Sequence, residues 1–175
     1  AQEATEPLLE MLHDDNMNVR RVTVEALGRI ASEASIPAML EALQDDAWWL
    51  RWSAAYALGR IGDHQVIPQL LQALHDENGN VRQAAAEALG QLGAVDAMPQ
   101  LIEPLSDEEW WVRWAAATAL RQLNDSQAFS ALIPLLRDTS QNVRWAATEA
   151  IGKLGSSAAA PHLIQALRDG SWEVC

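Results

Sequence analysis

The chain has 175 residues, of which 24 are Asp or Glu and 12 are Lys or Arg, so its formal net charge is -12. This acidic excess repels phosphate backbones and anionic lipid surfaces, and it predicts that neither nucleic acid nor a membrane is a partner. Strong helix formers far outnumber β-branched residues, and eight tryptophans stand against one tyrosine and one phenylalanine. The composition therefore predicts an all-α protein that is rich in tryptophan.

Two further features of the sequence indicate the cellular compartment of the protein. No apolar run reaches about 18 residues, and residues 1–12 lack the basic start and apolar stretch of a signal peptide. The single cysteine, Cys175, has no internal partner, which excludes a disulfide framework. We therefore expect a cytoplasmic protein.

A dipeptide of Val or Leu followed by Arg recurs every 31 residues, with an aspartate five residues before each mark. A fixed period of this size indicates stacked helical repeats. We expect one repeat array over residues 1–175, and a fragment of a longer array, because the chain ends just as a new repeat begins. The marks of the period are Val19, Leu50, Val81, Val112, Val143 and Val174.

Each unit reads as two helices. The first, for example residues 47–61, places its apolar residues on one face at helical spacing, and the second, for example residues 67–76, carries a proline near its start. Pro104 and Pro134 lie deeper in their units, which predicts that those second helices are kinked or shortened. Neither helix can bury its apolar face alone, so stacked pairs must share one continuous core.

These patterns, D-x5-R with VR-x2-AA-x-ALG-x-[IL]G followed by P-x-L-x2-AL, resemble the HEAT-like repeats of phycobilin lyases and their relatives, from about Thr5 to Cys175. The resemblance implies an all-α fold, a right-handed α-solenoid of about five helical hairpins. It also implies that the recurring aspartates and arginines form a hydrogen-bonded ladder between neighbouring units. These residues are Asp14, Asp45, Asp76, Asp107 and Asp138, with Arg20, Arg51, Arg82, Arg113 and Arg144.

One side of each first helix points away from the buried stripe. By the resemblance, this side lines the concave surface of the superhelix, which is the usual groove for a partner. We call it the first-helix face. Its four columns are Asn18, Trp49, Asn80, Trp111, Asn142; Arg21, Trp52, Gln83, Trp114, Trp145; Glu25, Tyr56, Glu87, Thr118, Glu149; and Arg29, Arg60, Gln91, Gln122, Lys153.

Aromatic residues gather on this face in two clusters, one in residues 48–56 and one in residues 110–114 that Trp145 adjoins. Tryptophan is enriched at binding hot spots, and a large aromatic patch left in water is a liability. We expect these clusters to bind a protein partner with basic and apolar surface, because acidic charge surrounds an aromatic floor. The residues predicted to bind it are Trp49, Trp52, Tyr56, Arg60, Trp111, Trp114 and Trp145.

Two other roles remain open for the tryptophans. The rings can pack across the seam between units, a structural role that suits Trp48, Trp110 and Trp172 best, because these three share one column. The patch can also mediate self-association, which is a version of the partner groove.

Catalytic patterns are sparse. The four histidines are scattered along the chain, no Cys-His or Ser-His arrangement emerges, and no Gly-rich phosphate loop is present. We expect no catalytic residue, no metal and no cofactor, and therefore a non-catalytic scaffold for protein-protein interaction. The resemblance implies one alternative, a phycobilin lyase or chaperone-like subunit that binds a linear tetrapyrrole. An engineered HEAT-like repeat binder is another, although the drift between units favours a natural origin.

Overall fold

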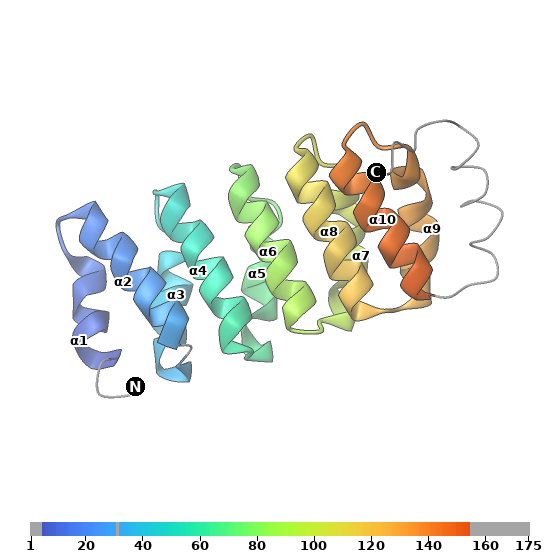
Figure 1. Cartoon of the computed structure of the whole chain (residues 1–175). Coiled ribbons are helices and arrows are strands. Elements are labelled where there is room, and N and C mark those ends of the chain that lie inside the picture. Colours follow the sequence, from blue (N-terminus) through green and yellow to red (C-terminus); the bar gives the residue numbers. More distant parts are fainter. Residues whose placement is uncertain (1–4, 31, 155–175) are drawn as a thin grey trace.

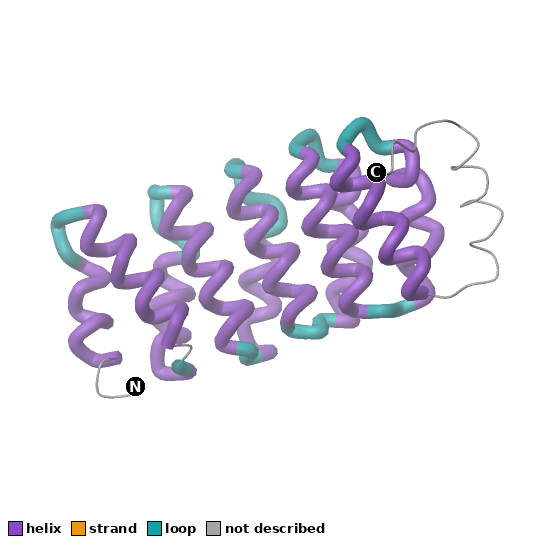
Figure 2. Tube along the Cα trace, viewed as in Figure 1, coloured by secondary structure: helices purple, strands orange, loops and turns teal. Residues whose placement is uncertain are grey.

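The computed structural model describes residues 5–30 and 32–154, which form ten α-helices joined by loops and short 3-10 segments (Figure 1). Within these ranges the chain contains no strand (Figure 2). The all-α solenoid predicted from the sequence is therefore confirmed. The last mark of the period, Val174, and Trp172 lie outside the described residues.

The helices stand in two layers (Figure 1). The first helices form one layer, in which each packs against the next. They are α2 (Met17–Ile30), α4 (Trp48–Ile61), α6 (Gly79–Gln91), α8 (Trp110–Leu123) and α10 (Gln141–Leu154). The second helices form the layer behind and are shorter. They are α1 (Thr5–Glu10), α3 (Ile36–Ala42), α5 (Ile67–Ala73), α7 (Met98–Ile102) and α9 (Phe129–Leu132).

Proline decides how long the second helices are. In α3 and α5 it stands in the first turn, where its missing N–H costs no helical hydrogen bond, and both helices run for seven residues. Pro104 and Pro134 fall after the first turn, and there the chain changes to the 3-10 segments Glu103–Ser106 and Ile133–Arg137. The prediction that these second helices are shortened is confirmed, since α7 has five residues and α9 four.

Small residues bring the first helices close together. A Cβ on Gly59 would lie 2.7 Å from the Cα of Ala88, and one on Gly90 would lie 2.8 Å from the Cα of Ala119. The glycines therefore permit a backbone approach that no larger residue allows, which offsets their low helix propensity. Beside them, one fully buried aliphatic column runs through the whole stack: Leu27, Leu58, Leu89, Leu120 and Ile151.

Candidate functional site

At three successive steps of the array, an arginine from one unit forms two hydrogen bonds with an aspartate of the next unit. In each pair the arginine Nε donates to one carboxylate oxygen at 2.7 Å, and Nη2 donates to the other at 2.8 or 2.9 Å. The Nη1 of the same arginine donates to the backbone oxygen of the aspartate in its own unit. Each guanidinium thus joins two consecutive loops. The pairs are Arg51 with Asp76, Arg82 with Asp107, and Arg113 with Asp138.

The ladder holds its carboxylates in the charged form. Burial acts to raise the pKa of Asp107. The hydrogen bonds from Arg82 and from the Glu109 backbone N–H act in the opposite direction and together outweigh burial, so the pKa lies below its ordinary value. The carboxyls of Asp76 and Asp138 have lowered pKa values for the same reasons. The hydrogen bond to Asp107 also raises the pKa of Arg82. These charges are engaged with one another, and this pairing suits a structural role.

The ladder is incomplete at its N-terminal end, where the sequence predicted a step between Arg20 and Asp45. Among the described residues no hydrogen bond or ion pair joins these two, and the buried Nε of Arg20 has no partner. The Arg20 guanidinium is held instead by the carbonyl oxygens of Asp14 and Asp15 in its own loop. At the other end, Arg144 donates to the backbone oxygen of Asp138 at 2.9 Å.

The aromatic residues predicted to bind a partner do not share one environment. Tyr56, Trp52 and Trp145 are exposed, with exposed fractions of 42%, 37% and 56%. Trp49 and Trp114 are partly buried and pack against the core. Three of the six aromatic residues predicted to bind a partner are thus exposed, and neighbouring side chains partly cover the other three, Trp49, Trp111 and Trp114.

Trp111 packs against the preceding unit. Its indole nitrogen is buried without a hydrogen-bond partner among the described residues, and it lies 3.3 Å from the position that a Cβ on Gly79 would occupy. Its ring meets that of Trp110 edge to face, with 5.9 Å between centroids. This tryptophan therefore fills the seam between α6 and α8.

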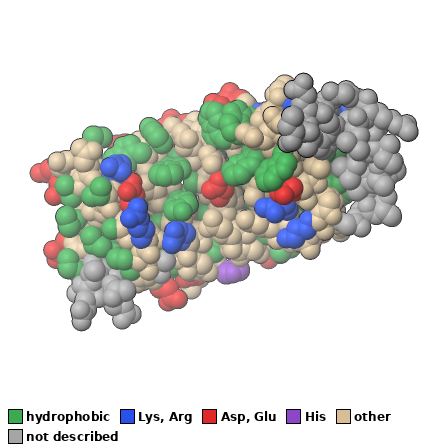
Figure 3. Space-filling model, viewed as in Figure 1, with side chains coloured by type: hydrophobic (Ala, Val, Ile, Leu, Met, Phe, Trp, Pro, Cys, Tyr) green, Lys and Arg blue, Asp and Glu red, His purple; other side chains and the backbone are tan. Residues whose placement is uncertain are grey.

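The structural role expected for Trp48 and Trp110 is wrong, since both side chains are exposed. Each is the first residue of its helix, α4 or α8. A helical side chain leans toward the N-terminus, so at this position it extends beyond the helix end, where no preceding turn covers it. In Figure 3, hydrophobic side chains gather in two groups on this face, one over α4 and one over α8 and α10.

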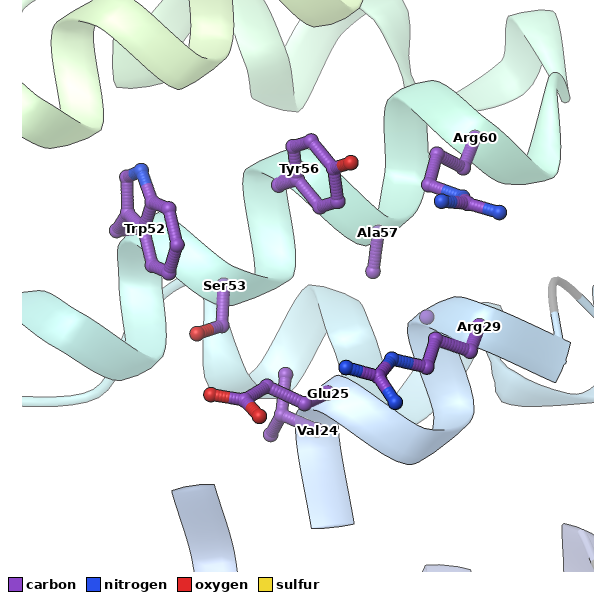
Figure 4. Close-up of a pocket in the computed structure, with 9 residues that line it drawn as sticks. Val24, Glu25, Arg29, Trp52, Ser53, Tyr56, Ala57 and Arg60 are labelled. Carbon is purple, nitrogen blue, oxygen red and sulfur yellow. The ribbon is translucent and has the colours of Figure 1, made fainter. Parts of the chain in front are cut away.

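A pocket of about 580 Å³ opens on the first-helix face between α2 and α4. The rings of Trp52 and Tyr56 project from α4, and Glu25 and Arg29 project from α2 (Figure 4). The two rings are stacked, with 6.2 Å between centroids and 18° between planes. The Cζ of Arg60 lies 6.0 Å from the Tyr56 centroid, within the range of a cation-π contact. The pocket is lined by Val24, Glu25, Gly28, Arg29, Trp52, Ser53, Tyr56, Ala57 and Arg60.

The charge of the first-helix face differs from that of the whole chain. Its acidic residues have partners on the first helices: Glu25 pairs with Arg21, Glu87 accepts from Gln83, and Glu149 lies 3.8 Å from Arg121. Basic residues outnumber them, and Figure 3 shows these beside the hydrophobic groups. The sequence led us to expect acidic charge around the aromatic residues, whereas basic side chains outnumber acidic ones on this face. The basic residues of its four columns are Arg21, Arg29, Arg60 and Lys153, and the acidic ones are Glu25, Glu87 and Glu149.

Of the residues predicted to bind a partner, the structure brings Trp52, Tyr56 and Arg60 together at this pocket, whereas Trp145 lies three units further along, on α10. Sequence reasoning assigned no role in a pocket to Ser53 or Arg29. The signal in the sequence was the column that holds Arg29 and Arg60, because glutamine replaces arginine in the next two units, at Gln91 and Gln122.

Neither a metal-binding cluster nor a membrane-spanning helix is present in the part of the chain that the structure describes. No group of three or more His, Cys, Asp or Glu side chains in residues 5–30 and 32–154 is placed to hold a metal ion. No helix in the same ranges is long and apolar enough to cross a lipid bilayer.

Comparison with known proteins places this architecture. The family described as HEAT repeats matches the chain over residues 5–90, 46–105, 67–136 and 98–175. No curated protein matches the sequence significantly. The complex of CpcE and CpcF of phycocyanin lyase from Nostoc sp. PCC7120 is similar in structure, with a TM-score of 0.79 and 24% identity over 96% of this chain and 71% of the other.

Artificial proteins share the fold as well. An engineered protein has a TM-score of 0.67 and 20% identity, over 94% of this chain and 85% of the other. A designed armadillo repeat protein has a TM-score of 0.63 and 20% identity, over 87% of this chain and 82% of the other. At this level of identity the structural matches establish the solenoid fold alone. The matches to the repeat family span nearly the whole sequence, and the chain therefore belongs to the family of HEAT repeat proteins.

Proposed function

We propose that this chain is a non-catalytic scaffold that binds a protein partner on its first-helix face, with Trp52, Tyr56 and Trp145 as apolar anchors. HEAT repeats supply the stack of helices, and the exposed aromatic side chains supply the contact surface. The Asp-Arg ladder and Trp111 then serve to hold the scaffold itself together.

The observation that carries the proposal is the exposure of these three large rings on one face of a solenoid whose core is complete without them. Exposed aromatic groups of this size are typical of interaction sites, where Trp and Tyr contribute more binding energy than most residues. Trp49 and Trp114 support them as partly buried neighbours. A partner that covers the face would remove this apolar surface from water.

The charge of the face also informs the choice of partner. Because basic side chains outnumber acidic ones on it, a partner with apolar and acidic surface suits this face better than a basic one. The acidic excess of the chain lies elsewhere, including the loops that lead into the first helices, such as Asp45-Asp46, Asp76-Glu77 and Asp107-Glu108.

A pull-down from an extract of the source cells tests the proposal. The bait proteins are the wild type, the double variant Trp52→Ala/Trp145→Ala, and a control variant, Val95→Ala, which removes an exposed apolar side chain from the turn between α6 and α7. We expect the double variant to lose the captured protein and the control to keep it, while all three retain helical circular dichroism. Equal capture by the double variant would remove the first-helix face as the binding surface. If the captured protein is a second copy of the chain, the face serves self-association.

A second candidate function is the binding of a linear tetrapyrrole in the pocket between α2 and α4, which combines stacked rings with two arginines. Titration with biliverdin tests it. Saturable quenching of tryptophan fluorescence together with a change in the visible spectrum would support pigment binding. Unchanged spectra at millimolar pigment would exclude it.

A further inference from the structure

We propose that the pocket between α2 and α4 binds an acidic peptide segment of the protein partner, in which a carboxylate stands next to an aromatic or aliphatic side chain. The inference rests on the proposed function and names the chemistry that this part of the first-helix face recognises. Three features of the pocket carry it: an apolar floor with an aromatic wall, two arginines without a carboxylate partner, and a buried hydroxyl without a hydrogen bond.

The apolar part of the pocket suits one side chain of moderate size. Val24 and Ala57 form a floor that is buried in the protein. The stacked rings of Trp52 and Tyr56 form the wall and are only partly exposed to water. A phenyl or branched aliphatic group would contact the accessible part of the two rings, and its burial there provides the apolar share of the binding energy.

The basic part of the pocket lies beside this wall. Arg29 and Arg60 both line the pocket, and among the described residues neither is paired with a carboxylate. Glu25, the one acidic residue at the pocket, is bound to Arg21. The local charge is therefore positive in a chain whose net charge is -12. Guanidinium groups bind carboxylates through charge-assisted hydrogen bonds, and an arginine over a ring leaves its N–H groups free for this purpose.

Ser53 adds an independent indication of a polar ligand group. It lines the pocket from α4 with an exposed fraction of only 5%, and its Oγ has no hydrogen-bond partner among the described residues. A buried hydroxyl without a partner costs free energy, and a carboxylate oxygen in the pocket would accept its hydrogen bond.

The later units close the equivalent space. The Oε1 of Gln91 lies 3.0 Å from the position that a Cβ on Gly59 would occupy, and the Oε1 of Gln122 lies 2.5 Å from that position at Gly90. Arg60 stands in the same column, but only Ala57 comes within 4 Å of that position at Gly28, because Arg60 lies toward Tyr56 instead. The amides that cover the glycines between α4 and α8 therefore have no counterpart between α2 and α4, and the pocket opens there.

Two small probes separate the carboxylate from the apolar group: N-acetyl-L-phenylalanine, which is an anion at pH 7, and its uncharged amide. We would record the indole N–H signals by NMR during each titration, with the Trp52 signal assigned through a Trp52→Phe variant. Groups of this size bind in the millimolar range at best. We expect the acid to shift the Trp52 signal in a saturable way, with a dissociation constant about fivefold or more below that of the amide.

The matched variants are Arg29→Gln/Arg60→Gln and Arg121→Gln, which removes a basic side chain from another first helix, α8. The double variant should lose the preference for the acid, and Arg121→Gln should keep it. The inference is overturned if acid and amide bind equally, if neither shifts the Trp52 signal, or if the preference survives in the double variant. The pull-down with the tryptophan variants judges the scaffold function separately, so each hypothesis can fail alone.

Discussion

Arg82 holds Asp107 of the next unit through two hydrogen bonds, from Nε to Oδ2 at 2.7 Å and from Nη2 to Oδ1 at 2.8 Å. Its Nη1 donates at the same time to the carbonyl oxygen of Asp76 in its own unit at 2.9 Å. Both side chains are largely buried. One guanidinium thus fixes the spacing of two successive loops, and the repetition of this bond keeps the first helices in register.

Replacing the carboxylate of this pair should destabilise the array. In Asp107→Asn the amide keeps one acceptor oxygen but leaves the buried Arg82 without its counter-charge. We expect the free energy of unfolding to fall by about 2 kcal/mol, measured by urea denaturation followed by circular dichroism. The control is Asp45→Asn, which lies in the same column without an arginine bound to its side chain. It should cost less than about 1 kcal/mol, and equal losses in the two variants would contradict a role for the ladder.

The contribution of the ladder to the stability of the folded chain should fall at acid pH. The pKa values of Asp76, Asp107 and Asp138 are lower in the folded chain than the ordinary value near 3.8. A lowered pKa contributes stability that is present above the unfolded value and is lost as the pH falls through the folded value. The urea midpoint should therefore hold from pH 7 to about pH 5 and then decline. Asp107→Asn should show a shallower decline than the wild type, and parallel curves would argue against this linkage.

Because α4 and α6 approach closely, replacing Gly59 with alanine should lower the stability of the fold instead of raising it. In an ordinary helix interior Gly→Ala is stabilising, by roughly 0.5–1 kcal/mol. In Gly59→Ala the new methyl group would meet the Cα and Cβ of Ala88 at 2.7 Å, so the helices must separate. We expect a loss of about 1–3 kcal/mol in thermal or urea unfolding. An unchanged or raised stability would show that the helices can separate without cost.

Two tryptophans should respond differently to truncation. Trp111 fills the seam beside Gly79, so Trp111→Ala should cost about 2 kcal/mol or more of stability, while Trp145→Ala should cost less than about 1 kcal/mol because its ring is exposed. Urea unfolding of both variants gives the comparison. Similar losses would mean that Trp145 also supports the fold and is not available as an anchor.

The period of the sequence predicts the stack of helices, because each unit repeats the same apolar stripe. The period does not predict how deeply each residue of one column is buried. Trp52 and Trp114 share a column, yet Trp52 is exposed and Trp114 packs against the core. The residue that follows Trp52 in that column is Gln83, whereas the larger Trp145 follows Trp114.

The pocket between α2 and α4 could not be predicted from the sequence either. Its presence follows from the side-chain direction of Arg60, which differs from that of Gln91 at the equivalent position. Neither the spacing of residues nor their type determines such a direction, because it depends on which neighbouring group the side chain contacts. For the same reason the sequence could not show that Arg20 binds its own loop rather than Asp45.

The most direct test of the scaffold function is the affinity of the captured partner for single variants of the first-helix face. Its dissociation constant would be measured by calorimetry for Trp52→Ala, Tyr56→Ala, Trp145→Ala and the control Val95→Ala. We expect each of the three aromatic variants to weaken binding about tenfold or more, which corresponds to about 1.4 kcal/mol, and the control to bind like the wild type. Unchanged affinity in all three aromatic variants would contradict the account.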